Sequence, residues 1–310
     1  MSVLITGGAG FIGGHLTRRL VDDRAADVTI IDNFSRGQRA NLDLFRNQIR
    51  LIEGDICDRH LLNRLMPGVD VIFHLAARSS VMDAVRNPQS AFATNVDGTY
   101  KLLECARRHN VSRVVFASSR EVYGEASYLP VPETAELRPK NAYGASKVAA
   151  EGYCRRYSGS GVQVAILRLT NVYGPGDHGR VIPCFIESAL RGEALTLFGG
   201  DQLLDFVWIE TVVGALIRAA ERPWRGGAMN IGSGRGCSLR ALSQRIKDCA
   251  KSQSPVVPGA PRAAEVVRFV SDISLAVKHL DLTRPEDPLA HLPSLVMAVR
   301  SNALQAGVEV

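Results

Sequence analysis

Tyr143 and Lys147 have the side chains and the spacing to move a proton. They are four residues apart, which would place both side chains on one face of a helix. Because an ammonium group beside a phenol stabilises the phenolate, we expect Lys147 to lower the pKa of Tyr143 from about 10 towards neutrality. Tyr143 could then take a proton from an alcohol while a hydride leaves the alcohol carbon, with the Ser119 hydroxyl bonded to the same oxygen. The spacing alone also arises by chance in surface pairs, so its weight depends on neighbouring motifs.

A glycine-rich loop near the start of the chain predicts a dinucleotide site. The apolar run Val3–Thr6 leads into TGGAGFIG, in which Gly7, Gly8, Gly10 and Gly13 fit two related glycine patterns. Glycine permits the tight turn and a close approach of the backbone to a pyrophosphate, which then faces the amino end of the next helix. The alternative is an incidental glycine-rich turn.

Two acidic residues follow at places that suit a dinucleotide. Asp32 ends the next expected strand, where a carboxylate can hold ribose hydroxyls and repel a 2′-phosphate, so NAD is favoured over NADP. Arg36 weakens that exclusion somewhat. Asp55 could accept a hydrogen bond from adenine, or could instead cap the helix that follows it.

The first half of the chain alternates short apolar runs with amphipathic stretches, which predicts β-α-β units and a parallel sheet. The expected strands are Val3–Thr6, Val28–Asp32, Arg50–Glu53, Val71–Leu75, Arg113–Ser118 and Val164–Leu169. The expected helices are Phe11–Val21, a long one from Pro88 to His109 with Phe92, Val96, Leu103 and Ala106 on one face, and Tyr143–Tyr157.

After residue 171 the sequence becomes dense in turn-forming residues, which predicts a second unit interleaved with the first. Residues 183–191, 211–221, 239–250 and 272–280 are expected to be helical, and Asn171–Gly179, Gly199–Asp205 and Gly232–Gly236 are expected to be loops. We therefore predict an α/β fold with a doubly wound parallel sheet (Rossmann type), formed by residues 1–171 and 206–231. Residues 172–205 and 232–310 would form a smaller C-terminal α/β lobe.

Composition narrows the class of protein. The chain has 310 residues, of which 46% are hydrophobic and 22% charged, as in a globular protein rather than a disordered one. It has no long apolar run or signal-like start, so we expect a soluble cytoplasmic protein with no membrane partner. The net charge of +6 is dispersed in short doublets, so we expect no nucleic-acid partner. The six cysteines and seven histidines have no metal-ligand spacing, so we expect free thiols and no metal.

Seven motifs in order resemble one protein family, the extended short-chain dehydrogenase/reductases. Within it, they are most similar to the nucleotide-sugar epimerases and dehydratases typified by UDP-galactose 4-epimerase, over about residues 2–280. The motifs are Thr6–Gly13, Asp32–Gly37, Phe73–Arg78, Ser118–Gly124, Tyr143–Lys147, Arg168–Gly176 and Asn230–Gly234.

The resemblance implies a tightly held NAD, a UDP-linked nucleotide-sugar substrate, and a homodimer formed by the helices near 89–109 and 143–157. The implied NAD contacts are Gly7, Gly10, Phe11, Ile12, Gly13, Asp32, Asn33, Asp55, Ile56, Leu75, Ala77, Arg78, Asn95, Tyr143 and Lys147. The implied substrate contacts are Ser119, Asn171, Val181, Pro183, Thr196, Leu197, Phe198, Arg262 and Glu265.

Two positions depart from the family pattern. Leu204 stands where an arginine usually meets the diphosphate, and Arg180 or Arg235 could substitute for it. Arg120 and Glu121 stand where epimerases usually have small residues. Relatives that eliminate water or lose carbon dioxide have a glutamate at the position of Glu121, although Glu121 could also be a solvated turn residue.

Three functions follow from these residues. The favoured one is an NAD-dependent nucleotide-sugar 4-epimerase of the UDP-glucose/UDP-galactose type, working through a transient 4-ketosugar with Ser119, Tyr143 and Lys147. The second adds a Glu121-dependent step and gives an NDP-sugar dehydratase or a UDP-glucuronate decarboxylase. The third is a non-catalytic NAD-binding regulator, against which the intact Ser119, Tyr143 and Lys147 argue.

Overall fold

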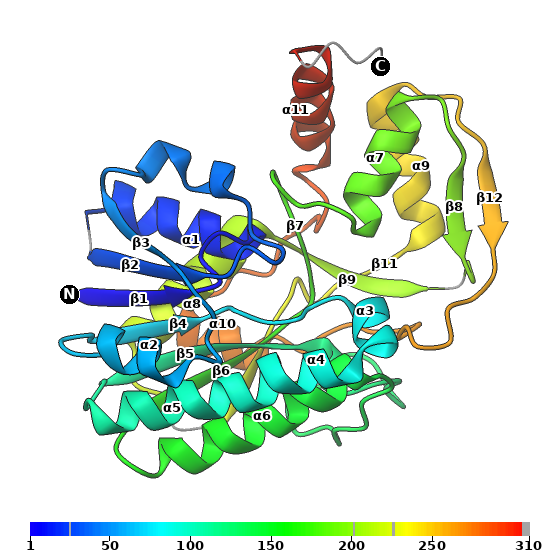
Figure 1. Ribbon diagram of the computed structural model, residues 1–310. Coiled ribbons are helices and arrows are strands. Elements are labelled where there is room, and N and C mark those ends of the chain that lie inside the picture. Colours follow the sequence, from blue (N-terminus) through cyan, green and yellow to red (C-terminus); the bar gives the residue numbers. More distant parts are fainter. Residues whose placement is uncertain (25, 201, 225–226, 306–310) are drawn as a thin grey trace.

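A sheet of seven parallel strands forms the centre of the protein (Figure 1). The computed structural model describes residues 1–24, 26–200, 202–224 and 227–305. In spatial order the strands are β10 (Ala228–Ile231), β6 (Gln163–Leu169), β5 (Arg113–Ser119), β4 (Val71–His74), β1 (Ser2–Thr6), β2 (Asp27–Asp32) and β3 (Ile49–Glu53). The strand order reverses beside β1, and such a switch point opens a crevice at the carboxyl ends of the strands.

Helices cover both faces of this sheet because its strands alternate apolar side chains between two cores. On one face α1 (Phe11–Asp22), α8 (Ile209–Glu221) and α10 (Ser274–Leu280) pack on the face to which Ile5 points. On the other, α2 (Arg59–Leu65), α5 (Thr99–Arg108) and α6 (Ala142–Ser158) pack on the face to which Leu4 points (Figure 1). The predicted doubly wound Rossmann fold is confirmed.

The smaller lobe has two short sheets and three helices around its own core. One sheet contains β7 (Asn171–Tyr173), β9 (Leu203–Trp208) and β11 (Gly236–Ser238), and the other contains β8 (Leu195–Phe198) and β12 (Val256–Gly259). Three helices, α7 (Val181–Leu190), α9 (Leu239–Ala250) and α11 (Leu292–Gln305), share one apolar cluster with β8.

The long helix predicted from Pro88 to His109 is interrupted. It consists of α4 (Pro88–Phe92), a π-helical turn at Ala93–Gly98 and α5, and a short helix, α3 (Val81–Arg86), precedes it. A π-turn inserts an extra residue, so side chains before it are rotated relative to those after it. Phe92 is accordingly 60% exposed, and its predicted place on the buried face with Val96 and Leu103 is wrong.

Three predicted loops include residues of strands. Asn171–Tyr173 is β7 and pairs with β9, and β9 begins at Leu203 inside the expected loop Gly199–Asp205, of which residue 201 lies outside the described part. Of the loop expected at Gly232–Gly236, the last residue begins β11.

β10 and α8, which belong to the segment 206–231 of the proposed sheet domain, lie with the sheet. The proposed boundary at residue 205 falls inside β9, and α10, assigned to the lobe, packs on the sheet. Residues 306–310 lie outside the described part.

All six cysteine thiols are free. Within the described residues, no helix has the length and apolar character to span a membrane, and no three His, Cys, Asp or Glu side chains cluster as metal ligands.

Candidate active site

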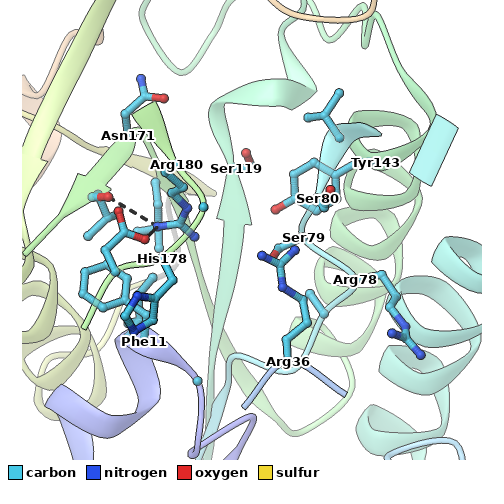
Figure 2. A pocket seen from close by; sticks show the side chains of 18 of the residues that line it. Phe11, Arg36, Arg78, Ser79, Ser80, Ser119, Tyr143, Asn171, His178 and Arg180 are labelled. Atoms are coloured by element: carbon cyan, nitrogen blue, oxygen red, sulfur yellow. Dashed lines mark hydrogen bonds and ion pairs between the residues drawn. The ribbon is translucent and has the colours of Figure 1, made fainter. Parts of the chain in front are cut away.

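A cavity of about 630 Å³ lies where the carboxyl ends of the sheet strands meet the lobe. Its walls combine the glycine loop and the ends of β2, β4 and β5 with lobe residues from β7, β8 and α7. Figure 2 shows Ser119 and Tyr143 on one side of it, and Phe11, His178 and Arg180 on the other.

The glycine loop forms a cradle with no room for side chains. Gly7 has a φ of +73°, and a Cβ on Gly13 would lie 2.3 Å from the Gly7 carbonyl oxygen. Helix α1 starts from Gly10 with no side-chain cap, so its first amides remain available to an anion in the cavity. The loop therefore fits the pyrophosphate of a dinucleotide.

Acidic side chains at the ends of β2 and β3 complete the fit. Asp32 is buried in the cavity wall, where its carboxylate accepts hydrogen bonds from the Ala9 and Phe34 amides, both at 2.9 Å, and burial raises its pKa. Asp55 accepts hydrogen bonds from the Asn33 side chain and the Cys57 amide. The capping alternative for Asp55 is wrong, because Asp58 caps α2.

All but one of the residues expected to contact NAD line this cavity. The exception is Asn95, which is buried behind the wall and bonds both backbone groups of Arg78 and the Ser146 hydroxyl. Asn95 therefore holds the Arg78 segment in place. The lining residues on the list are Gly7, Gly10, Phe11, Ile12, Gly13, Asp32, Asn33, Asp55, Ile56, Leu75, Ala77, Arg78, Tyr143 and Lys147.

Most of the residues expected to contact substrate also line the cavity: Ser119, Asn171, Val181, Thr196, Phe198, Arg262 and Glu265. Leu197 does not, because alternate residues of β8 face opposite ways and Leu197 packs in the lobe core. Pro183 is likewise buried in α7 outside the lining. The Arg262 guanidinium lies 3.8 Å from the Phe198 ring centroid and pairs with Glu265 at 3.0 Å.

Ser119 and Tyr143 are neighbours in the cavity wall, but Lys147 acts differently from our expectation. Burial raises the pKa of Tyr143 to about 12, while the Ser119 hydroxyl and the guanidinium groups of Arg180 and Arg36 oppose that rise. The Lys147 ammonium donates to the Ala117 carbonyl at 2.8 Å, and burial lowers its pKa to about 8. The predicted low pKa of Tyr143 is therefore wrong for the protein alone, because desolvation of the phenol dominates.

Glu121 is buried in the cavity wall, so the alternative of a solvated turn residue is wrong. Both carboxylate oxygens are held: one by Arg120 at 3.0 Å and the other by the Asn141 amide at 2.7 Å. Asn141 also caps α6, because its side-chain oxygen accepts a hydrogen bond from the Gly144 amide. Sequence reasoning missed Asn141, although this residue stands two positions before Tyr143. One Arg120 guanidinium nitrogen, Nη1, is buried without a partner among the described residues.

The loop between β7 and α7 brings one further charged residue, Asp177, that sequence reasoning did not single out. Asp177 is buried in the cavity wall 3.3 Å from Arg180, and burial raises its pKa to about 6. His178 is exposed at the cavity edge (Figure 2). Of the two suggested substitutes for the arginine missing at Leu204, Arg180 lines the cavity, whereas Arg235 donates to the Pro285 carbonyl outside it.

Known proteins are similar to this chain in both sequence and fold. The family model of the NAD-dependent epimerase/dehydratase family matches residues 3–232. A UDP-glucose 4-epimerase of Mycolicibacterium smegmatis is 33% identical over 308 residues, covering 96% of this chain and 95% of that protein. A UDP-N-acetyl-α-D-glucosaminuronate decarboxylase of Bacillus cytotoxicus is 36% identical over 265 residues, covering 82% of each chain.

A solved structure agrees closely. The dTDP-glucose 4,6-dehydratase of Streptomyces venezuelae, crystallised with NAD, superposes with a TM-score of 0.93. It is 32% identical in sequence, and the match covers 98% of each chain. By name, these relatives are an epimerase, a decarboxylase and a dehydratase. The family and the fitted cradle identify NAD as the cofactor. The chain belongs to the NAD-dependent epimerase/dehydratase family.

Proposed function

We propose that this chain is a nucleotide-sugar 4-epimerase that acts on a UDP-linked hexose through a transient 4-ketosugar. The observation that carries the proposal is the neighbouring pair Ser119 and Tyr143 in a cavity wall where Glu121 has both oxygens held. A carboxylate restrained by a guanidinium and an amide makes a poor mobile base, so Ser119 and Tyr143 remain as the groups that can serve the sugar hydroxyl.

Tyr143 would take the proton of the 4-hydroxyl while Ser119 donates a hydrogen bond to the same oxygen. Bound NAD would supply the hydride acceptor for oxidation at carbon 4 and the hydride donor for reduction from the other face, and Tyr143 would then give its proton back to the 4-oxygen. Positive charge from Arg36 and Arg180 opposes the effect of burial on the pKa of Tyr143, and Lys147 fixes the strand end through the Ala117 carbonyl.

The lobe would hold the nucleotide. Arg180 and Asn171 line the cavity on the side away from Tyr143 (Figure 2) and would contact the diphosphate. Arg262, already stacked on Phe198, offers a guanidinium fork suited to phosphate oxygens. Together these residues would bind the ligand without the arginine that Leu204 replaces.

A decarboxylase of a UDP-linked uronic acid is the second candidate. It is favoured by the buried position of Glu121 near Tyr143 and by the unpartnered Nη1 of Arg120, since a guanidinium can pair with a carboxylate. The B. cytotoxicus relative is a decarboxylase of this kind.

Proton NMR of the purified protein with UDP-glucose, UDP-galactose and UDP-glucuronate separates the two candidates. Interconversion at carbon 4 without a change of mass is expected, whereas loss of carbon dioxide or water would contradict the epimerase assignment. Glu121→Gln should retain most epimerase activity in the folded protein and abolish a decarboxylation. Glu125→Gln is the matched control, because Glu125 pairs with Lys140 outside the cavity lining.

We also propose a homodimer through the outer faces of α5 and α6. Tyr100 and Tyr153 are both partly exposed there, with ring centroids 5.4 Å apart, and Phe92 projects from the adjoining α4. Exposed aromatic groups of this kind are enriched at interfaces. Light scattering should give twice the 33.6 kDa chain mass, and Tyr153→Glu should give the monomer.

A further inference from the structure

Glu151 is fully buried although its charge has no place in the reaction proposed above. It lies on α6 one turn after Lys147, and its carboxylate is held from two strands. Arg168 of β6 donates to both oxygens at 2.9 and 2.7 Å, and Ser118 of β5 donates to one of them at 2.6 Å. Arg155, on the same helix, donates to the other at 2.6 Å.

The hydrogen bonds of this cluster continue on the far side of Arg168. Its remaining nitrogen donates to the Tyr123 hydroxyl at 2.7 Å, and Tyr123 donates to the Asn230 side chain of β10 at 2.7 Å. Arg168 is directly opposite Ser118 in the β5–β6 register and opposite Asn230 in the β6–β10 register. The cluster therefore joins three strands to one helix.

Two hydrogen bonds tie the carboxyl end of β5 to α6. The Lys147 ammonium donates to the Ala117 carbonyl at 2.8 Å, and the Ser118 hydroxyl donates to Glu151 at 2.6 Å. Ser119 is the next residue of β5, and Tyr143 lies in the first turn of α6. The separation of the Ser119 and Tyr143 hydroxyls is thus set by how these two elements are joined.

We propose that Glu151 is a positioning residue: held by Arg168, its carboxylate anchors Ser118 and so fixes Ser119 at hydrogen-bonding reach of Tyr143. The proposal rests on the assignment of Ser119 and Tyr143 as the reacting pair. It predicts that loosening the Ser118 bond weakens the influence of Ser119 on the phenol. The charged groups that act on Tyr143 are Glu121, Arg180 and Arg36, and none of them belongs to this cluster.

Ser118→Ala is the main test because it removes one hydroxyl and leaves the Glu151–Arg168 ion pair intact. Glu151→Gln is the second variant, although it leaves Arg168 without its counter-charge and can unfold the chain. Ser243→Ala is the matched control, since Ser243 is an equally buried serine that donates to a backbone carbonyl, that of Arg240, in the lobe. Ser118→Thr restores the hydroxyl.

Two measurements are made on the NAD-loaded protein. The first is the ¹⁹F NMR titration of 3-fluorotyrosine-labelled protein, with the Tyr143 signal identified by Tyr143→Phe. In Ser118→Ala its midpoint should rise by about half a pH unit, because a hydrogen bond to the phenolate is weakened. The second is turnover of the nucleotide sugar, for which kcat should fall about tenfold with KM unchanged. Ser243→Ala and Ser118→Thr should follow the wild type in both.

A Ser118→Ala protein that titrates like the wild type and keeps its kcat would overturn the proposal. A fall in kcat with no movement of the titration would also overturn it, because Ser119 would then not be the group displaced. A wild-type protein that turns over no nucleotide sugar would contradict the proposed function instead, while the titration still decides the positioning role.

Discussion

Gly13→Ala tests whether the glycine loop has to carry the cofactor in the geometry described. The added Cβ would lie 2.3 Å from the Gly7 carbonyl oxygen and 2.6 Å from the Gly8 Cα, and both atoms belong to the backbone. Backbone atoms cannot rotate away as the end of a side chain can, so the loop and α1 would have to separate by about 1 Å to reach ordinary contact distance.

Such a separation should act mainly on NAD. Moving the first turn of α1 would weaken about two charge-assisted hydrogen bonds from its amides to the pyrophosphate, at about 1.5 kcal/mol each, so the NAD affinity should fall roughly 100-fold. Overpacking should lower the free energy of unfolding by about 1–3 kcal/mol. Calorimetric titration with NAD and urea unfolding of the cofactor-free protein would measure the two effects separately.

Gly152→Ala is the control for this substitution. Gly152 also lies in a helix, but a Cβ there would meet nothing within 4 Å, so alanine should raise the free energy of unfolding by up to about 1 kcal/mol. NAD affinity should not change in this variant. A Gly13→Ala protein that binds NAD within about threefold of the wild type would refute the reasoning about the cradle.

Two further predictions follow from the buried charges of Lys147 and Asp177, and a third from the cavity-lining charge of Arg180. Burial lowers the pKa of Lys147 from 10.5 to about 8, so the free energy of unfolding should rise with pH between these two values. Lys147→Met should abolish activity, yet urea unfolding at pH 7 should show the variant to be about 2 kcal/mol more stable than the wild type. Burial raises the pKa of Asp177 from 3.8 to about 6, so between these pH values the folded state retains a proton that the unfolded state releases, and the unfolding free energy of the wild type should fall as the pH rises. Asp177→Asn should therefore gain about 2 kcal/mol over the wild type between about pH 4 and pH 6, with little further change at higher pH. Arg180→Met should raise the KM for the nucleotide sugar about tenfold, whereas Arg235→Met should leave it unchanged.

β10 was not among the expected strands; the other strands of the central sheet were predictable because most strands covered on both faces are nearly continuous apolar runs. The lobe strands are not. β9 contains Asp205, whose buried carboxylate accepts hydrogen bonds from Ser233 and Ser271, residues far along the chain. A local pattern cannot reveal that such a charge is satisfied by distant partners, so the segment was assigned to a loop.

The candidate site was predictable where spacing alone places a residue, as in the glycine loop and at Asp32. It was not predictable where the environment decides the behaviour of a side chain. The pKa of Tyr143 follows from its burial, in a cluster with Ala84 of α3 and Ala91 of α4, and the burial of Glu121 follows from its contacts with Arg120 and Asn141. Both depend on segments that meet only in the folded chain.

Helix α10 has a consequence for the order in which the polypeptide can fold. Its residues Ala276 and Leu280 are fully buried against the sheet, beside α8 and β10. A ribosome must therefore release the chain as far as Leu280 before the cofactor-binding half can close its second face. Until then the nascent chain exposes the apolar surface that α10 later covers. Truncation before this helix, or slow translation near it, should therefore promote aggregation.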